Sequence, residues 1–328
     1  MVLEDPVEGF FVKTVDNLIF EVKGVVHPEN RIIAYLRYVP SPESSTGFRK
    51  VYNLEEREEY LRAKYSDYLW YSESYGRVIQ SVPESKTASI LSPIECLAHL
   101  RHADDITSLE HESIALANIL VEMTGIKWTD IGLTGSQLVG VAGIDSDIDL
   151  VVYGENVCRG FYSGIRAKIR DIPKIKGYSG KLLEDHVTFR WGDQTDLRPL
   201  LLEIERNKLL QGMINAKHFF IRMVKTPHDL DYTFSDLSYE MLGYQKISGR
   251  VLDSSDAIFT PCEYQVECMN NPDLAKLTSY RGRFTEQVSV GDQFEALGRL
   301  ELVTDHREGR QYTQLVLGER PIDYLVPV

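Results

Sequence analysis

The chain has 328 residues, of which 43% are hydrophobic and 26% charged, and its formal net charge is −13. This length exceeds what one hydrophobic core usually serves, so it predicts two or three domains. The acidic balance argues against a protein that grips long nucleic acid through its phosphates, because such proteins usually carry a basic surplus. Non-specific DNA binding is therefore not expected.

The sequence has no apolar run near the roughly 20 residues that a transmembrane helix needs. Its first residues also lack the basic and apolar segments of a secretory signal. We therefore expect a cytoplasmic protein that does not bind membranes. The cysteines, whose spacing fits no usual zinc site, are expected to be buried free thiols in a reducing compartment: Cys96, Cys158, Cys262 and Cys268.

The N-terminal part of the chain is predicted to be β-rich with a helical tail, over residues 1–95. Short runs of β-forming residues up to Val39 are interrupted by turn-forming pairs such as Asp16-Asn17, and a loop follows over 40–47. Residues 55–65 are charged and predict a helix. Residues 60–75 include six aromatic residues: Tyr60, Tyr65, Tyr68, Trp70, Tyr71 and Tyr75. They could stack on nucleic-acid bases, but packing in a core or between domains is the favoured interpretation.

A helical region begins at Pro93, and its clearest helix is predicted over 106–123, with Gly125 as its end. The following residues, 128–134, have the pattern of a short buried strand. This strand ends at Gly135-Ser136. Glycine there allows a backbone to approach a bulky ligand closely and gives phosphate oxygens access to N–H groups. Ser136 is expected to cap a short helix over 137–141.

Ten residues after Ser136 the chain reads Asp147-Ile148-Asp149-Leu150, within a run of β-forming residues that ends at Gly154. Residues i and i+2 of a strand point to the same face, so Asp147 and Asp149 are expected to lie together. Hard divalent cations such as Mg²⁺ bind through carboxylate oxygens and leave positions for phosphates and water. The pattern as a whole predicts a unit that holds a metal and a triphosphate.

Beyond this motif the sequence predicts a basic helix over 157–171, a strand over 187–191, a helix over 197–211 and an apolar strand over 218–224. From about residue 244, short β-forming runs separated by Gly291, Gly298, Gly309 and Gly318 predict a small barrel or sandwich. The expected domains are thus 1–95, 96–235 and 236–328. The expected fold class is α+β, with a central mixed sheet and helices flanked by β-rich N- and C-terminal modules.

At the motif, the chain resembles the nucleotidyltransferase superfamily, which has the DNA-polymerase-β-like fold. The match lies at Gly135, Ser136, Asp147, Ile148, Asp149 and Leu150. The whole chain also resembles a group of uncharacterised archaeal predicted nucleotidyltransferases, in stretches that include 9–12, 25–28 and 257–262.

The resemblance implies a metal-dependent transfer of a nucleoside monophosphate from a nucleoside triphosphate to an acceptor hydroxyl, on RNA or on a small molecule. Asp147 and Asp149 would hold Mg²⁺ or Mn²⁺, and Gly135-Ser136 would cradle the phosphates. The superfamily usually adds a third carboxylate from a neighbouring strand. Here the strand over 218–224 has Arg222 and no acid. Arg222 could contact a phosphate or the acceptor, or form an ion pair with a core carboxylate. The third acid is sought among Asp185, Asp229 and Asp231.

Three other functions stay open. The first is a regulatory protein that binds the nucleotide but turns it over weakly, because the third carboxylate is missing. The second is an RNA-processing factor whose terminal modules hold a structured RNA. The third is modification of a partner protein, which ranks below transfer to RNA or to a small molecule, because the nucleotidyltransferases that modify proteins are much shorter.

Overall fold

The computed structural model describes residues 5–192, 194–268 and 271–328, and in these ranges it contains seven α-helices and eighteen β-strands. The expected α+β class is confirmed. The chain forms two compact units. Unit 1 comprises the chain up to Glu73, Arg77–Lys168 and Ile214–Phe234; unit 2 comprises Ser74–Gly76, Ile169–Met213 and Ser235–Val328. Residues 169–213, expected in the central domain, thus group with the C-terminal strands, and the three-domain division stays a prediction.

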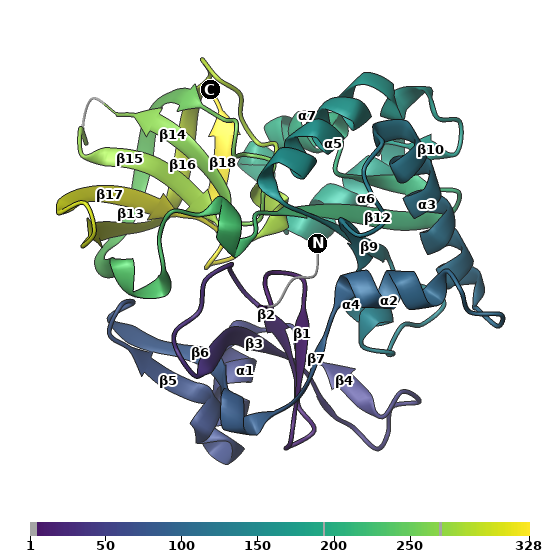
Figure 1. Cartoon of the computed structure of the whole chain (residues 1–328). Coiled ribbons are helices and arrows are strands. Elements are labelled where there is room, and N and C mark those ends of the chain that lie inside the picture. Colours follow the sequence, from purple (N-terminus) through teal and green to yellow (C-terminus); the bar gives the residue numbers. More distant parts are fainter. Residues whose placement is uncertain (1–4, 193, 269–270) are drawn as a thin grey trace. The chain divides into compact units, whose positions relative to one another are not determined.

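The N-terminal strands of unit 1 form one sheet, drawn in purple to blue in Figure 1. The order is β5-β6-β3-β2-β1-β7, with β4 paired to β3. The expected helix over 55–65 is present as α1 (Leu54–Lys64). The strand bounds are β1 (Phe11–Thr14), β2 (Ile19–Val22), β3 (Arg31–Pro40), β4 (Phe48–Lys50), β5 (Leu69–Ser72), β6 (Arg77–Pro83) and β7 (Thr87–Leu91).

Unit 1 also contains the mixed sheet that carries the motif. β9 (Ile148–Tyr153) lies between β8 (Ile131–Leu133), to which it is antiparallel, and β12 (Lys217–Val224), to which it is parallel. Three helices contact β9: α3 (Ser108–Thr124), the short α4 (Gly135–Leu138) and α5 (Glu155–Lys168). The short helix α2 (Pro93–Leu100) precedes α3, and α4 lies between β8 and β9.

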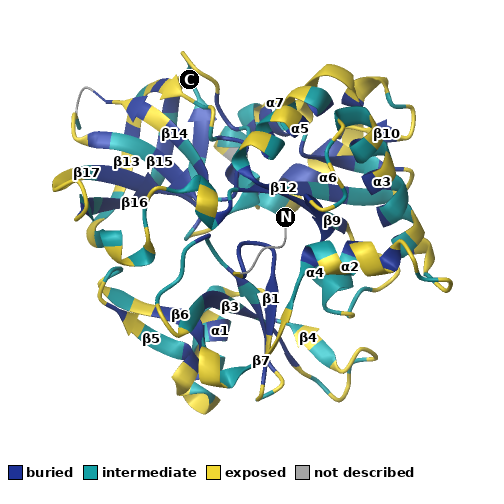
Figure 2. Cartoon of the chain, in the orientation of Figure 1, coloured by how far each residue is buried: buried dark blue, intermediate teal, exposed yellow. Residues whose placement is uncertain are grey.

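The strand β9 is buried over most of its length, as its dark blue colour in Figure 2 shows. Val151 and Tyr153 belong to the same apolar core as the N-terminal strands. Because side chains alternate along a strand, Asp149 lies on the face of these two residues, and Ile148 and Leu150 lie on the other. One face of the motif strand is thus turned towards the N-terminal module.

Local signals explain where the long helix α3 begins and ends. Thr107 accepts a hydrogen bond from the backbone N–H of Glu110, whose carboxylate in turn accepts from the N–H of Thr107. At the other end Gly125 takes a left-handed conformation, with φ of 75°. The sequence prediction for this helix is confirmed, and β8 follows it.

Unit 2 contains a closed ring of paired strands, in the order β13-β14-β15-β17-β16, with β16 paired back to β13 and β18 added at β16. This order is that of a small barrel. Its strands are β13 (Leu237–Asp253), β14 (Cys262–Glu267), β15 (Leu274–Ser279), β16 (Gln293–Asp305), β17 (Arg310–Val316) and β18 (Tyr324–Pro327). The unit also holds α6 (Gly180–Trp191), α7 (Arg198–Asn207) and the neighbouring strands β10 (Ile175–Lys176) and β11 (Gln211–Ile214).

The strand predicted over 187–191 is wrong, because these residues end the helix α6. Their β-forming side chains favoured a strand locally. The buried positions, however, are Leu183, His186, Val187 and Trp191, which is the spacing of one helical face. Burial on that face decides the structure.

The C-terminal strands are also longer than predicted. Gly298, expected between two strands, lies inside β16. A Cβ at this position would come within 2.5 Å of the carbonyl oxygen of Val316, so glycine lets two paired strands approach closely. Its role is close packing rather than a turn.

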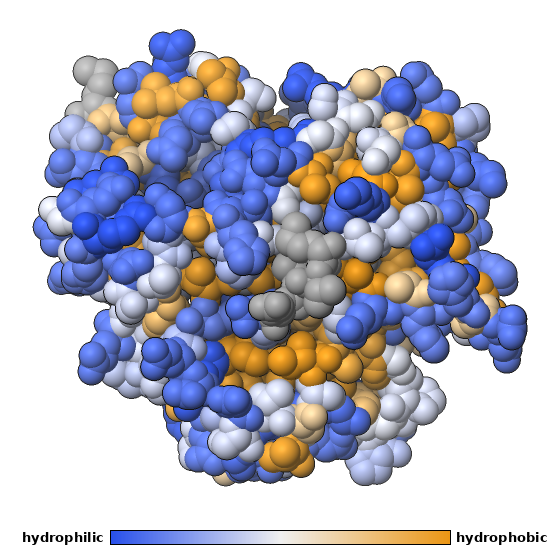
Figure 3. Space-filling view, viewed as in Figure 1, coloured by the Kyte–Doolittle hydropathy of each residue, from blue (hydrophilic) through white to orange (hydrophobic). Residues whose placement is uncertain are grey.

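No helix in the described part of the chain is long and apolar enough to cross a membrane. The face of the molecule seen in Figure 3 is mostly hydrophilic, with smaller hydrophobic areas between the polar residues.

Candidate functional site

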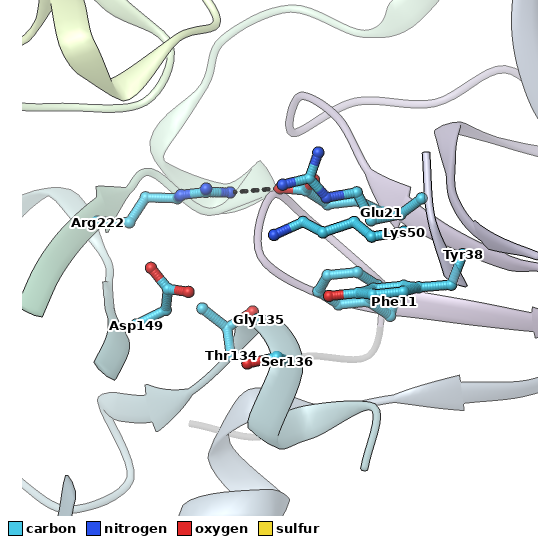
Figure 4. Close-up of a pocket in the computed structure, with 10 residues that line it drawn as sticks. Phe11, Glu21, Tyr38, Lys50, Thr134, Gly135, Ser136, Asp149 and Arg222 are labelled. Atoms are coloured by element: carbon cyan, nitrogen blue, oxygen red, sulfur yellow. Dashed lines mark hydrogen bonds and ion pairs between the residues drawn. The ribbon is translucent and has the colours of Figure 1, made fainter. Parts of the chain in front are cut away.

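Three residues of the motif, Gly135, Ser136 and Asp149, line a polar cavity of about 110 Å³ in unit 1 (Figure 4). One side comes from the mixed sheet and α4, and the other comes from the N-terminal sheet. The cavity thus brings Gly135, Ser136 and Asp149, which the sequence predicts, together with residues that it does not. The complete lining is Phe11, Glu21, Arg37, Tyr38, Lys50, Thr134, Gly135, Ser136, Asp149 and Arg222.

Gly135 lies directly against the carboxylate of Asp149. The backbone N–H of Thr134 donates to the carbonyl oxygen of Asp149 at 2.9 Å, which fixes the chain before Gly135 beside β9. Gly135 has φ of 70°, and a Cβ there would overlap the carboxylate oxygen Oδ2 of Asp149. Only glycine therefore permits both the left-handed backbone and the close approach.

The two aspartates of the motif differ in environment. Burial raises the pKa of the Asp149 carboxyl; Arg222 opposes this shift, whereas the charge of Asp147 adds to it. Asp147 is exposed, directly precedes β9 and does not line the cavity. Its position two residues before Asp149 still favours the same face, and the joint metal site stays a prediction.

The short helix differs from its prediction in both of its bounds and in its cap, since it covers Gly135–Leu138 rather than 137–141. The helix α4 begins at Gly135, so Ser136 lies inside it and does not cap it. The residue at the cap position is Thr134, whose hydroxyl instead donates to the carbonyl oxygen of Gly9 at 2.5 Å. Ser136 keeps its place in the cavity wall.

The strand β12, on which a third acid is first expected, carries Arg222 and no acid. Phe220 pairs with Asp149 and Arg222 with Val151, so Arg222 lies on the Asp149 face of the sheet. Its Nη1 donates to Oε1 of Glu8 at 2.5 Å and to Oε1 of Glu21 at 3.2 Å. The interpretation of Arg222 as an ion-pair partner of core carboxylates is confirmed, and Arg222 also lines the cavity.

Glu8 and Glu21 are held by a second cation as well. The Nζ of Lys23 lies 2.8 Å from Oε1 of each carboxylate, and the side chain of Glu8 is fully buried. Although burial favours the neutral form of Glu21, the nearby Lys23, Arg222 and Arg37 hold the pKa of its carboxyl well below the usual value. Glu21 is therefore an ionised and already paired carboxylate at the cavity wall.

An irregularity in β3 brings two further residues of the N-terminal sheet, Arg37 and Tyr38, to the cavity. Ile19 pairs with Tyr38, but the next residue of β2 pairs with Leu36, so Arg37 is an extra residue. Such a bulge redirects side chains and here lets Arg37 and Tyr38 both face the cavity. Lys50 is the partner of Tyr38 on β4. Burial raises the pKa of the Tyr38 phenol to about 12, so it stays protonated at neutral pH.

None of the sought third acids lines the cavity. Asp185 is exposed on α6 and pairs with Lys181 at 3.0 Å. Asp229 accepts hydrogen bonds from the backbone N–H groups of Thr226 and Glu155, so it fixes the start of two helical segments. Asp231 is not a lining residue either. Besides Asp149, the acid that lies in the wall is Glu21. Its signal in the sequence is weak, because it is one charge within a run of β-forming residues.

The side chains that could act as metal ligands match the needs of a hard cation only in part. Among the described residues, no cluster of three or more His, Cys, Asp or Glu side chains forms a ready-made metal site. Mg²⁺, however, is usually held by one or two carboxylates together with phosphates of the substrate and water. The glycine-backed carboxylate of Asp149, with Asp147 beside it in sequence, agrees with that kind of site.

The aromatic residues of 60–75 pack mainly against protein. Tyr68 is fully buried and its ring centroid lies 5.0 Å from that of Phe20, while Tyr65 contacts both Tyr60 and Tyr68. Tyr71 is an exception with 58% of its surface exposed. The favoured packing interpretation holds for the buried part of this group. All four cysteines are free thiols, and only Cys96 is not buried.

Comparison with curated proteins finds a relative of matching length. It is Uncharacterized protein MJ1086 of Methanocaldococcus jannaschii, 28% identical over 321 residues, with 94% of each chain covered. No family model and no solved structure matches the chain. The relative is an archaeal protein, and its printed name assigns no activity.

Proposed function

We propose that the protein is a metal-dependent nucleotidyltransferase, which moves a nucleoside monophosphate from a nucleoside triphosphate to an acceptor hydroxyl. The observation that carries this proposal is the contact between Gly135 and Asp149 at the wall of a polar, cation-lined cavity. A glycine kept free of a side chain directly beside a carboxylate leaves room for a metal-bound phosphate. The acceptor would be RNA or a small molecule.

In the proposed reaction, the acceptor oxygen forms a bond to the α-phosphorus. The bond from that phosphorus to the bridging oxygen breaks, pyrophosphate leaves with the electron pair, and the proton of the hydroxyl passes to solvent. Asp147 and Asp149 would hold Mg²⁺ or Mn²⁺, which would supply neutralisation of the triphosphate charge. The chain itself orients the reactants, and the cations of the cavity attract the phosphates.

The proposal is tested with nucleoside triphosphates labelled at the α-phosphate, incubated with total cellular RNA and protein, while pyrophosphate release is followed. We expect label on an acceptor. Tight metal-dependent nucleotide binding with neither label transfer nor pyrophosphate release would instead favour the regulatory function. The lack of turnover would then be explained by Arg222, which lies on the strand where a third carboxylate was expected.

Asp147→Asn and Asp149→Asn are each expected to lower turnover by about 100-fold, because an amide is a weaker ligand than a carboxylate for a hard cation. The melting temperature should stay the same or rise slightly for Asp149→Asn, since burial disfavours the charged form of this carboxyl. Asp145→Asn removes the same charge from the same exposed loop and serves as the control. Pyrophosphate release at equal rates in all three variants would contradict the assigned ligands.

A further inference from the structure

Three cations line the cavity, and they differ in how far carboxylates already neutralise them. Arg222 is bound to Glu8 and Glu21 at 2.5 and 3.2 Å. Arg37 lies farther from its partner, with 3.7 Å between its Nε and Oε2 of Glu21. Lys50 forms no ion pair with any residue that the structure describes; its ammonium lies 4.9 Å from the centre of the Tyr52 ring. The N-terminal sheet thus supplies the cation with the most capacity for a new partner.

The ammonium of Lys50 also points into the cavity, where a ligand can contact it. In Figure 4 its ammonium points into the space between Arg222 and Asp149, opposite Gly135 and Ser136. The bulge of β3 places Arg37 at the same wall. Two cations that face a glycine-serine turn across a small cavity form a complementary surface for an anion.

The size of the cavity restricts which part of a ligand it can take. Its volume of about 110 Å³ is well below the roughly 300–1,000 Å³ of pockets that enclose a whole small molecule. It suits a few phosphoryl groups, whereas a base and ribose would have to lie outside. A lysine ammonium is a compact point charge that suits phosphate oxygens from several directions.

We propose that Lys50, assisted by Arg37, binds the terminal phosphates of the nucleoside triphosphate, so that the N-terminal sheet selects triphosphates over monophosphates. This inference rests on the proposed function, which supplies the triphosphate as the ligand. It makes the N-terminal module a part of the binding site, and it gives Lys50 a role that the motif does not assign.

The test measures binding without metal and without turnover. Dissociation constants for inorganic tripolyphosphate, ATP and AMP are determined by calorimetry in the presence of a chelator. The variant is Lys50→Met, which keeps an apolar stem and removes the charge. Lys13→Met is the matched control, because Lys13 is an exposed lysine of the same sheet that forms no ion pair with the described residues.

We expect Lys50→Met to weaken binding of tripolyphosphate and of ATP by about 10- to 100-fold, the effect of one charge-assisted contact. Binding of AMP should change little, and Lys13→Met should behave as the wild type. Wild-type protein that does not bind tripolyphosphate, or a Lys50→Met protein that binds it equally well, overturns the inference.

The outcomes separate this inference from the proposed function. Lys50-dependent binding of tripolyphosphate without any nucleotidyl transfer supports the anion site and contradicts the transferase. Transfer of label that continues while Lys50→Met binds triphosphate normally supports the transferase and removes Lys50 from the site. Circular dichroism and the melting temperature of Lys50→Met show whether a loss of binding comes from unfolding.

Discussion

Gly135→Ala is expected to abolish most metal-dependent nucleotide binding and to lower turnover by on the order of 100-fold or more. The new Cβ overlaps Oδ2 of Asp149, so either the carboxylate or the turn must move. A displacement of about 1 Å in reacting groups can cost ~100-fold in rate. The measurement is calorimetric binding of a nucleoside triphosphate with Mg²⁺, together with pyrophosphate release.

Gly140→Ala is the matched control for this variant. Gly140 has φ of 72°, close to the 70° of Gly135, but a Cβ there meets no atom within 4 Å. Both variants therefore incur a similar conformational penalty of about 1–2 kcal/mol in folding free energy, and the overlap with Asp149 adds to the fall in melting temperature of Gly135→Ala. Only Gly135→Ala should lose binding. Equal binding by the two variants would show that the contact with Asp149 is not needed.

The motif could be predicted from the sequence because its parts are close along the chain. Gly135 follows β8, Asp149 lies on β9, and the two strands are antiparallel neighbours. Alternation along β9 then fixes which side chains share a face. Local spacing and strand periodicity are enough to bring Gly135, Ser136 and Asp149 to one cavity.

The opposite wall could not be predicted in this way. Glu21, Arg37 and Lys50 come from three strands of another sheet, and their approach to the motif depends on packing between segments that are far apart in sequence. The bulge that turns Arg37 towards the cavity exists only in the pairing of β2 with β3. Arg222 is conspicuous in the sequence as a charge in an apolar strand, whereas its partner Glu8 carries no such signal.

A comparable limit explains the strand that was wrongly predicted at the end of α6. Its β-forming residues and its helical burial pattern point to different structures, and tertiary packing decides between them. Trp191 illustrates this, because its indole N–H donates to Oε1 of Glu205 at 3.0 Å. That bond belongs to a buried polar network within unit 2 whose partners come from separate segments.

Glu205→Ala is expected to lower the free energy of unfolding by about 3–5 kcal/mol, the usual cost of removing one partner of a buried ion pair. The carboxylate of Glu205 is fully buried and accepts hydrogen bonds from Lys208 at 2.8 Å and from His186 at 3.1 Å, besides the bond from Trp191. Without Glu205, the buried ammonium of Lys208 keeps one hydrogen-bond acceptor among the described residues, the carbonyl oxygen of Arg283. Urea unfolding followed by circular dichroism measures the change.

The control and the pH dependence make this prediction specific. Glu203→Ala, at an exposed position of the same helix, should change stability by no more than about 0.5 kcal/mol. Burial alone would raise the pKa of Glu205, but Lys208 and the hydrogen bond from His186 outweigh it and lower this pKa. A lowered folded-state pKa gives stability that is complete above the unfolded value of about 4.3 and is lost as the pH falls below it. The difference in the free energy of unfolding between wild type and Glu205→Ala should therefore be larger at pH 7 than at pH 3. If this difference is the same at both pH values, the charge of Glu205 does not stabilise unit 2.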